Sequence, residues 1–231
     1  MIVQLSYAQT RAVGVAEGDW FKYGFTFDWN SELNMTSEEV PFSDFLMSEW
    51  VTLNIQDISG TNVTGCITIH FENGTDNTQD VSVDVDTGDG NLRNWLISAG
   101  LNANDLLYLS GSNERINETI TQTYPWGSRE TNHLVYSYNY SSEEDNSDIR
   151  VNMFWDKEIG VLTELSFEAD ALMNGTAMSA SALWTIVDSN IETIPEFDTS
   201  ALIIVTVSMT ILILWFKREE VNAHIERLSK L

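Results

Sequence analysis

The stretch WFKYGFTFDW, residues 20–29, alternates aromatic side chains with small or polar ones. Successive side chains of a β-strand point to opposite faces, so a period of two residues predicts a strand with one apolar face. A helix would scatter the same aromatic residues around its circumference. The aromatic positions that share the face are Phe21, Tyr23, Phe25, Phe27 and Trp29.

The same alternation returns along the chain. Gly, Asn and Asp residues separate the runs, as in DISGTN, ENGTDN and DTGDGN, and these residues favour tight turns. We therefore predict a mostly β domain: a curved antiparallel sheet, half-barrel or sandwich of about nine or ten strands. The alternating or β-rich runs after the first are residues 51–55, 63–71, 81–85, 116–124, 134–140, 149–155, 161–169 and 178–187.

One or two short helices are also predicted. Leu92, Trp95, Leu96 and Ala99 are spaced as on one face of a helix, and Gly100 follows as a stop signal. A second short helix or irregular segment is predicted over residues 36–50, where a Pro limits its regularity.

The longest apolar run covers residues 199–216 and contains no charge, Pro or Gly. As a helix it would be roughly 27 Å long, enough to cross a bilayer core. Acidic residues precede it, and Lys217 and Arg218 follow it. The positive-inside rule therefore predicts a single-pass protein of the cell membrane, with the N-terminal domain outside and the tail inside.

This topology divides the chain into parts. The first twelve residues lack a basic region, so they are not a complete signal peptide. Because a domain outside the membrane needs such a peptide, we interpret them as the remnant of a longer one. The predicted divisions are a signal remnant at 1–12, a β domain at 13–188, a linker at 189–198, a transmembrane helix at 199–216 and a cytoplasmic tail at 217–231.

The charge of the chain restricts its partners. Asp and Glu total 35 against 11 Lys and Arg, for a formal net charge of −24. Such a field repels phosphate backbones, so nucleic acid is excluded as a partner. The single cysteine, Cys66, cannot form a disulfide within the chain. Acidity is also a general solubility feature, so it does not by itself imply metal binding.

Six Asn-x-Ser/Thr sequons suit an extracellular domain, and several lie in predicted turns, where a glycan would be solvated. We predict that at least one is glycosylated; the alternative is ordinary turn-forming asparagine. The sequon asparagines are Asn34, Asn62, Asn73, Asn117, Asn139 and Asn174.

The turn DVDTGDGN brings Asp84, Asp86 and Asp89 close together in sequence, which invites a calcium hypothesis because hard cations prefer several oxygen ligands. The spacing does not match an EF-hand, and the alternative is a solvent-facing strand end. The acidic run SSEEDNSD raises the same question. No histidine lies in a recognised catalytic motif, so we expect a protein that is not an enzyme and has no cofactor apart from this calcium candidate.

The aromatic strand face permits two interpretations. One is ordinary core, and the other is a pocket for a lipid or another apolar ligand, formed by Phe21, Tyr23, Phe25, Phe27 and Trp29. The pattern alone does not decide between them. A contiguous apolar cavity of several hundred Å³ would support the pocket, and a tightly packed interior would contradict it.

Three segments carry a resemblance to known proteins: VGVAEGDWFKY, WDKEIGVL, and Pro195-Glu196-Phe197 before the apolar run. In these the chain resembles uncharacterised archaeal cell-surface proteins with a Pro-Glu-Phe motif and a C-terminal membrane helix. The tripeptide is similar to the sorting signals recognised by archaeosortases, which implies exchange of the helix for another anchor. The tail REEVNAHIERLSKL is longer than such signals usually have.

Together these features predict an acidic, glycosylated β domain anchored at the cell surface, acting by binding or structural contact in the envelope. The alternative is a membrane-tethered carrier or sensor that holds a lipid or another apolar ligand. Expected partners are the membrane and an envelope protein or a lipid.

Overall fold

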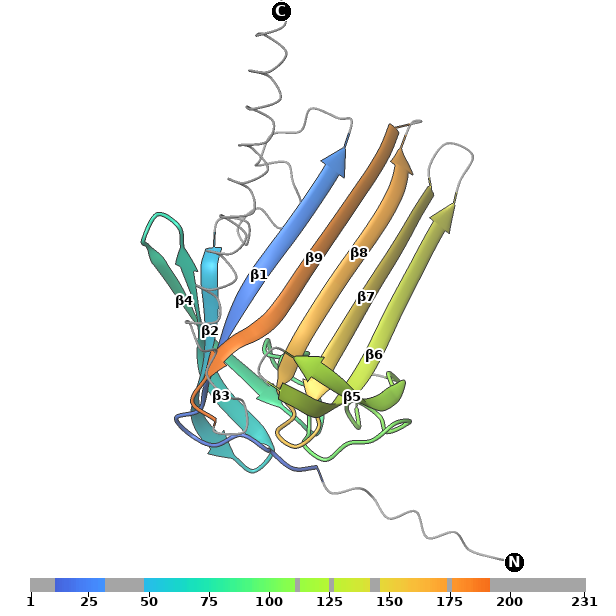
Figure 1. Ribbon diagram of the computed structural model, residues 1–231. Helices are drawn as coiled ribbons and strands as arrows, with labels where there is room; N and C mark the ends of the chain where they lie inside the picture. The colour runs from blue at the N-terminus through green and yellow to red at the C-terminus, as the bar shows by residue number, and fades with distance from the viewer. Residues whose placement is uncertain are drawn as a thin grey trace, which may run out of the picture. The chain divides into compact units, whose positions relative to one another are not determined.

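The computed structural model describes residues 11–31, 48–110, 113–124, 127–141, 146–173 and 176–191. These residues form nine strands in one open antiparallel sheet (Figure 1). The strands are β1 (Trp20–Ser31), β2 (Ser48–Ser59), β3 (Asn62–Phe71), β4 (Asp76–Asp84), β5 (Glu118–Tyr124), β6 (Gly127–Ser141), β7 (Asn146–Asp156), β8 (Leu162–Met173) and β9 (Thr176–Ser189).

The order of the strands is β4-β3-β2-β1-β9-β8-β7-β6-β5, so two meanders meet in the middle of the sheet. The first meander is β1 to β4, the second is β5 to β9, and they are joined where β9 pairs with β1. In Figure 1 β1, β9, β8, β7 and β6 run side by side. The prediction of a mostly β domain built from antiparallel hairpins is therefore confirmed.

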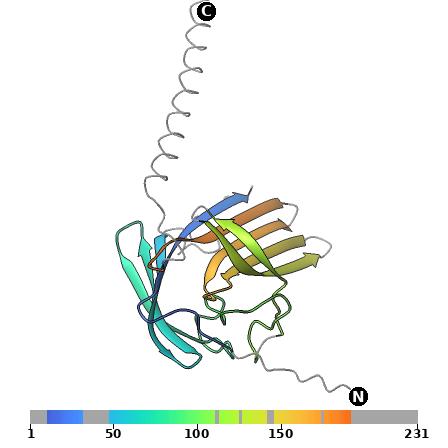
Figure 2. The ribbon, with the colours of Figure 1, turned by 60° about the horizontal axis from the view of Figure 1, so that its bottom comes forward.

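The sheet buries one face, here called the inner face. It is covered by the connecting segment between β4 and β5, of which residues 85–110 and 113–117 are described. Figure 2 shows this segment, largely in green, at one side of the sheet. Leu92, Leu96, Leu101 and Leu107 from the segment are fully buried with residues of the strands. The core therefore lies between a sheet and an irregular chain.

Two details of the prediction are corrected. The described strands form a single sheet that stays open at β4 and β5, instead of curling into a half-barrel or stacking as a sandwich. The physical reason is that the connecting segment supplies the apolar cover that closure or a second sheet would otherwise provide.

The helix predicted over residues 92–99 is wrong, because this part of the connecting segment forms turns. Asn94 has a φ of 74°, in the left-handed region that interrupts a helix. Leu96 forms a β-bridge with Val161. Leu92 and Leu96 are still buried as the spacing suggested, whereas Trp95 and Ala99 are half-buried. Contacts with the sheet hold the buried residues. The second predicted helix, over residues 36–50, lies mostly outside the described residues, and its last three residues begin β2.

Candidate functional site

The predicted aromatic face of β1 is divided between core and surface. Phe21 and Tyr23 are buried, whereas Phe25 and Phe27 are half-buried. The side chain of Trp29 lies outside what the structure describes. The core interpretation therefore holds for the first half of the strand. In the second half the aromatic side chains form a partly accessible surface on the inner face.

Tyr23 marks the border between these halves. Its hydroxyl donates a hydrogen bond to the carbonyl oxygen of Leu162 at 2.9 Å. Burial raises the pKa of Tyr23 far above its ordinary value, so the phenol stays neutral. Its ring meets that of Trp95 edge to face, with the ring centres 5.0 Å apart.

From Trp95 an aromatic series continues along the inner face. Trp95 and Trp184 of β9 lie 5.5 Å apart between ring centres, and Trp184 and Phe25 lie 5.2 Å apart. Phe25 stacks on Phe27 at 6.3 Å. These contacts join the connecting segment to β1 and β9 through one continuous aromatic surface.

Trp95 is held in place by the backbone around it. Leu162 N donates to the carbonyl oxygen of Trp95 at 2.8 Å. The indole Nε1 of Trp155 donates to the carbonyl oxygen of Asn94 at 2.8 Å. Because both neighbouring carbonyls are anchored to the β7–β8 region, the side chain of Trp95 projects from a rigid support.

Trp95 also borders a pocket of about 420 Å³ on β2, β3 and β4. Ligand pockets are typically about 300–1,000 Å³ and mainly apolar, with a few polar groups. This pocket falls within that volume range, and five of its seven lining side chains are aliphatic or aromatic. Its lining residues are Val51, Ile67, Ile69, Phe71, Asn77, Gln79 and Trp95.

The strand register explains why these residues meet. Ile69 lies between Val51 of β2 and Asn77 of β4. Ile67 lies opposite Gln79. Positions two apart in a strand share a face, so the floor of the pocket is one patch of the inner face, with amides on the edge strand and hydrocarbon further in.

The inner face remains apolar beyond Trp184. The register places Phe27, Ala182, Phe167, Val151 and Tyr136 in one row across β1, β9, β8, β7 and β6. In this row Ala182 is buried and the others are half-buried. The next tyrosine of β6, Tyr138, is 60% exposed. The row thus extends the hydrophobic surface from the pocket toward β6.

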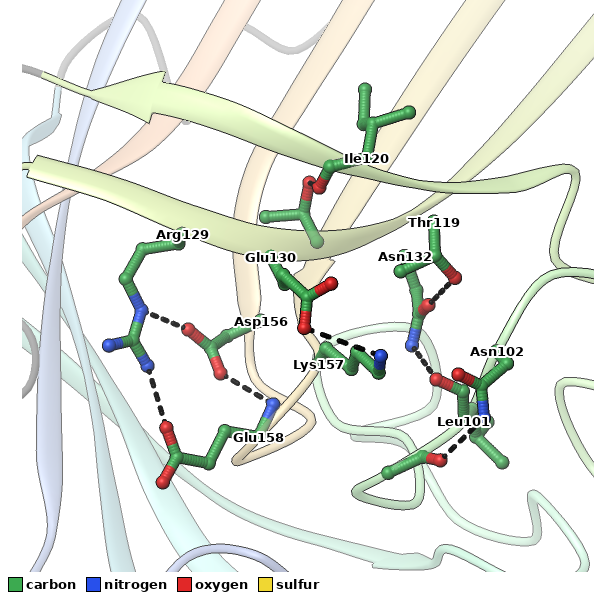
Figure 3. Close-up of polar contacts among 12 residues, drawn as sticks. Leu101, Asn102, Thr119, Ile120, Arg129, Glu130, Asn132, Asp156, Lys157 and Glu158 are labelled. Atoms are coloured by element: carbon green, nitrogen blue, oxygen red, sulfur yellow. Dashed lines mark hydrogen bonds and ion pairs between the residues drawn. The ribbon is translucent and has the colours of Figure 1, made fainter.

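A second pocket, of about 370 Å³, is lined mostly by charged residues and lies at the β7–β8 turn (Figure 3). Arg129 Nε donates to Asp156 Oδ2 at 2.6 Å, and Asp156 Oδ1 accepts the backbone N–H groups of Glu158 and Ile159. Lys157 pairs with Glu130 at 3.3 Å. The fully buried Asp156 carboxylate thus organises the turn and neutralises Arg129, which is a structural role.

The calcium candidates cap their own turn. Asp84 Oδ1 accepts the N–H groups of Asp86 and Thr87 at 2.8 and 3.3 Å, and Asp89 Oδ2 accepts the Thr87 hydroxyl at 3.0 Å. Burial acts to raise the pKa of Asp84, but these N–H groups and the Thr61 hydroxyl outweigh it and lower the pKa. Within the described ranges, His, Cys, Asp and Glu side chains form no group of three placed to hold a metal ion.

The described sequon asparagines lie at the surface. Asn62, Asn73, Asn117 and Asn139 are all exposed. Asn73 Oδ1 accepts hydrogen bonds from the backbone N and the hydroxyl of Thr75 in the β3–β4 turn. These positions leave room for a glycan, and their glycosylation stays a prediction.

Several predicted features lie outside the described residues. They include the sequon residues Asn34 and Asn174, the sorting motif Pro195, Glu196 and Phe197, the apolar run 199–216 and the tail 217–231. In the part of the chain that is described, no helix is long and apolar enough to cross a membrane.

No protein-family model matches this chain, and no curated protein matches it. Among solved structures, one match is described as "The Siderocalin Ex-FABP functions through dual ligand specificities", with 9% identity over 73% of this chain and 72% of that chain. The TM-score is 0.21, which is too low for this likeness to support a shared fold or function.

The sequence pointed to the right face and missed part of the site. Trp95 stood out as an apolar residue, although in a helix that does not form. Asn77 and Gln79 were not singled out. Their alternation with Thr78 and Asp80 on a strand that continues into Val81 and Val83 is a signal that could have placed them on the inner face.

Proposed function

We propose that this chain is a binding protein of the cell surface that holds an apolar ligand, such as a lipid, on the inner face of its sheet. The observation that carries the proposal is the pocket of about 420 Å³ lined by Val51, Ile67, Ile69, Phe71 and Trp95 with two amides. Its side chains supply hydrocarbon contact and hydrogen bonds, which favours binding over catalysis.

The aromatic surface beside the pocket supports the same role. Aromatic side chains bury large areas and remain rigid, so Trp95, Trp184 and Phe25 provide a firm wall for a flexible chain. The fold leaves three apolar side chains half-buried: Phe27, Phe167 and Val151. Their complete burial would stabilise the folded state further. A ligand that covers them would recover that free energy on binding.

The place of action is a proposal from the sequence. The apolar run 199–216, with acidic residues before it and Lys217 and Arg218 after it, supports a membrane anchor with the β domain outside. A tethered domain of this kind would meet its ligand at the membrane surface. The general alternative is envelope contact without a small ligand, for which the exposed sequon residues are the support.

A photoreactive alkane that carries a diazirine tests the binding proposal. The full-length chain, reconstituted in nanodiscs, is irradiated with the probe, and the labelled peptides are mapped by mass spectrometry. We expect labels on the peptides that contain Ile67 to Phe71 and Trp95. Labelling confined to residues 199–216, with none on the β domain, would reject the proposal.

A pair of variants controls the experiment. Ile69→Glu places a carboxylate in the pocket and should reduce labelling there by about tenfold or more, because an unpaired charge beside hydrocarbon costs more than about 1.4 kcal/mol. Thr68→Glu changes the neighbouring residue, which bonds Thr78 on the opposite face of the sheet, and should leave labelling unchanged. Equal loss in both variants would indicate a general effect on the fold.

A further inference from the structure

The polar side chains that line the apolar pocket are uncharged: two amides, together with the indole N–H donor of Trp95. None of its seven lining side chains is ionised: five are apolar, and the other two are Asn77 and Gln79. An amide offers both a hydrogen-bond donor and an acceptor but carries no net charge. The pocket is therefore matched to a head group with the same mixed capacity, such as a hydroxyl.

These amides are open to a ligand. Both residues are exposed on the edge strand β4, and neither side chain is hydrogen-bonded to another residue within the described ranges. Neighbouring polar residues are engaged elsewhere: Asp76 bonds His70 Nδ1 at 2.6 Å, and Thr78 bonds Thr68 at 3.0 Å. The amides of β4 thus retain their hydrogen-bonding capacity for a bound molecule.

The surrounding charge disfavours an anionic head. A carboxylate or phosphate in the pocket would meet no cation among its lining residues, and the chain as a whole carries a formal net charge of −24. A quaternary ammonium head would enter a favourable long-range field, but the pocket offers it no carboxylate and no more than the faces of Phe71 and Trp95. An uncharged head avoids both costs.

The arrangement of the pocket also gives the ligand a direction. The amides lie on the edge strand, whereas Ile67 and Ile69 lie on β3, Val51 on β2 and the aromatic border at β1. Three strand spacings of about 4.8 Å make this apolar path roughly 14 Å wide. A molecule with its polar head at β4 would therefore place a hydrocarbon chain across the sheet toward Trp95.

We propose that the pocket selects an uncharged long-chain lipid with a hydroxyl-bearing head, bound with the head at Asn77 and Gln79. This inference rests on the proposed apolar-ligand function and names its ligand class. It implies discrimination against a carboxylate or a quaternary ammonium on the same hydrocarbon chain.

Competition measures the selectivity. The full-length chain in nanodiscs is labelled with a diazirine derivative of hexadecanol, and hexadecanol, hexadecanoate and hexadecyltrimethylammonium compete at pH 7. We expect hexadecanol to displace the label from the pocket peptides at about tenfold lower concentration than either charged compound, equivalent to about 1.4 kcal/mol. Equal or better competition by a charged compound would overturn the head-group inference and leave the binding function standing. Absence of the hexadecanol label from pocket peptides that the photoreactive alkane does label would also overturn the head-group inference. Absence of both labels would reject the function itself.

A charge change at the head-group position gives an independent readout. Gln79→Lys supplies a cation on β4 and should make hexadecanoate about tenfold more effective as a competitor than in the natural protein. Gln56→Lys adds the same charge on β2 at an exposed residue outside the pocket lining, and no change is expected. If both variants make hexadecanoate an equally better competitor, the net charge of the protein governs selectivity and the position of the amides does not. The inference would then be wrong.

Discussion

The inner face has two parts that differ in burial. In the covered part, Phe21, Leu53 and Val161 are fully buried together with residues of the connecting segment. In the half-buried part, Phe25, Phe27, Phe167, Val151 and Tyr136 continue the same alternation with partial exposure. An apolar strand face is therefore equally suited to a core and to a binding surface, and what lies against it decides its role.

The strongest test of this difference removes one leucine from each part. Leu96→Ala empties a fully buried position of the connecting segment and should lower the free energy of unfolding by about 2–5 kcal/mol. Leu165→Ala removes a half-buried side chain of β8 and should cost about 1 kcal/mol. Denaturant unfolding of the full-length chain in one detergent measures both. Equal losses would mean that the two parts are equally packed.

A second test addresses the attachment of the connecting segment to the β7–β8 turn. Gly160 has a φ of +76°, accepts a hydrogen bond from Ile97 N at 2.9 Å, and lies so close to the Ile97 carbonyl oxygen that a Cβ would collide with it. Gly160→Ala should cost about 2–3 kcal/mol, from left-handed strain plus displacement of the segment.

Gly100 provides the matched control for that substitution. Its φ is +73°, but a Cβ would meet no described atom within 4 Å. Gly100→Ala should therefore show the conformational strain alone, about 1–2 kcal/mol. Thermal unfolding compares the two variants. A Gly100→Ala loss as large as that of Gly160→Ala would show that the close contact with Ile97 adds nothing.

The smallest expected effect concerns Glu164, which lies on the face of the sheet opposite to the inner face. Burial raises the pKa of Glu164, and attraction to His133 offsets this only in part. A raised pKa means that the folded state disfavours the carboxylate, so stability falls as pH rises from about 4.5 through the folded-state pKa. Glu164→Gln should raise the melting temperature slightly at pH 7 and have no effect below pH 4.5. A variant less stable at pH 7 would contradict this sign.

The strands were predictable from the sequence because their alternation is local. Residues 20–29 indicated β1, and the later runs lie within or overlap the strands β2 to β9. The turns that form around Trp95, in place of the predicted helix, were not predictable in the same way. Four apolar residues at helical spacing suit any segment that turns repeatedly toward a core, and Asn94 adopts a left-handed conformation stabilised by a distant partner, Trp155.

The site was predictable only as a face. The alternation identified Phe25 and Phe27 as candidates, but the pocket also depends on which strands are neighbours and where the connecting segment ends. Asn77 and Gln79 line the pocket because they pair opposite Ile69 and Ile67. Such pairing links residues through register, which a single strand pattern does not contain.

The position of β9 has a consequence for how the domain assembles. It is the last of the described strands, yet it lies between β1 and β8 and joins the two meanders. Its pairing with β1 brings together residues as far apart as Phe21 and Ser189. During synthesis the first four strands must therefore wait, without their central neighbour, until nearly the whole domain has been made. Contacts of such long sequence separation slow folding and leave the β1 edge exposed to wrong partners in the meantime.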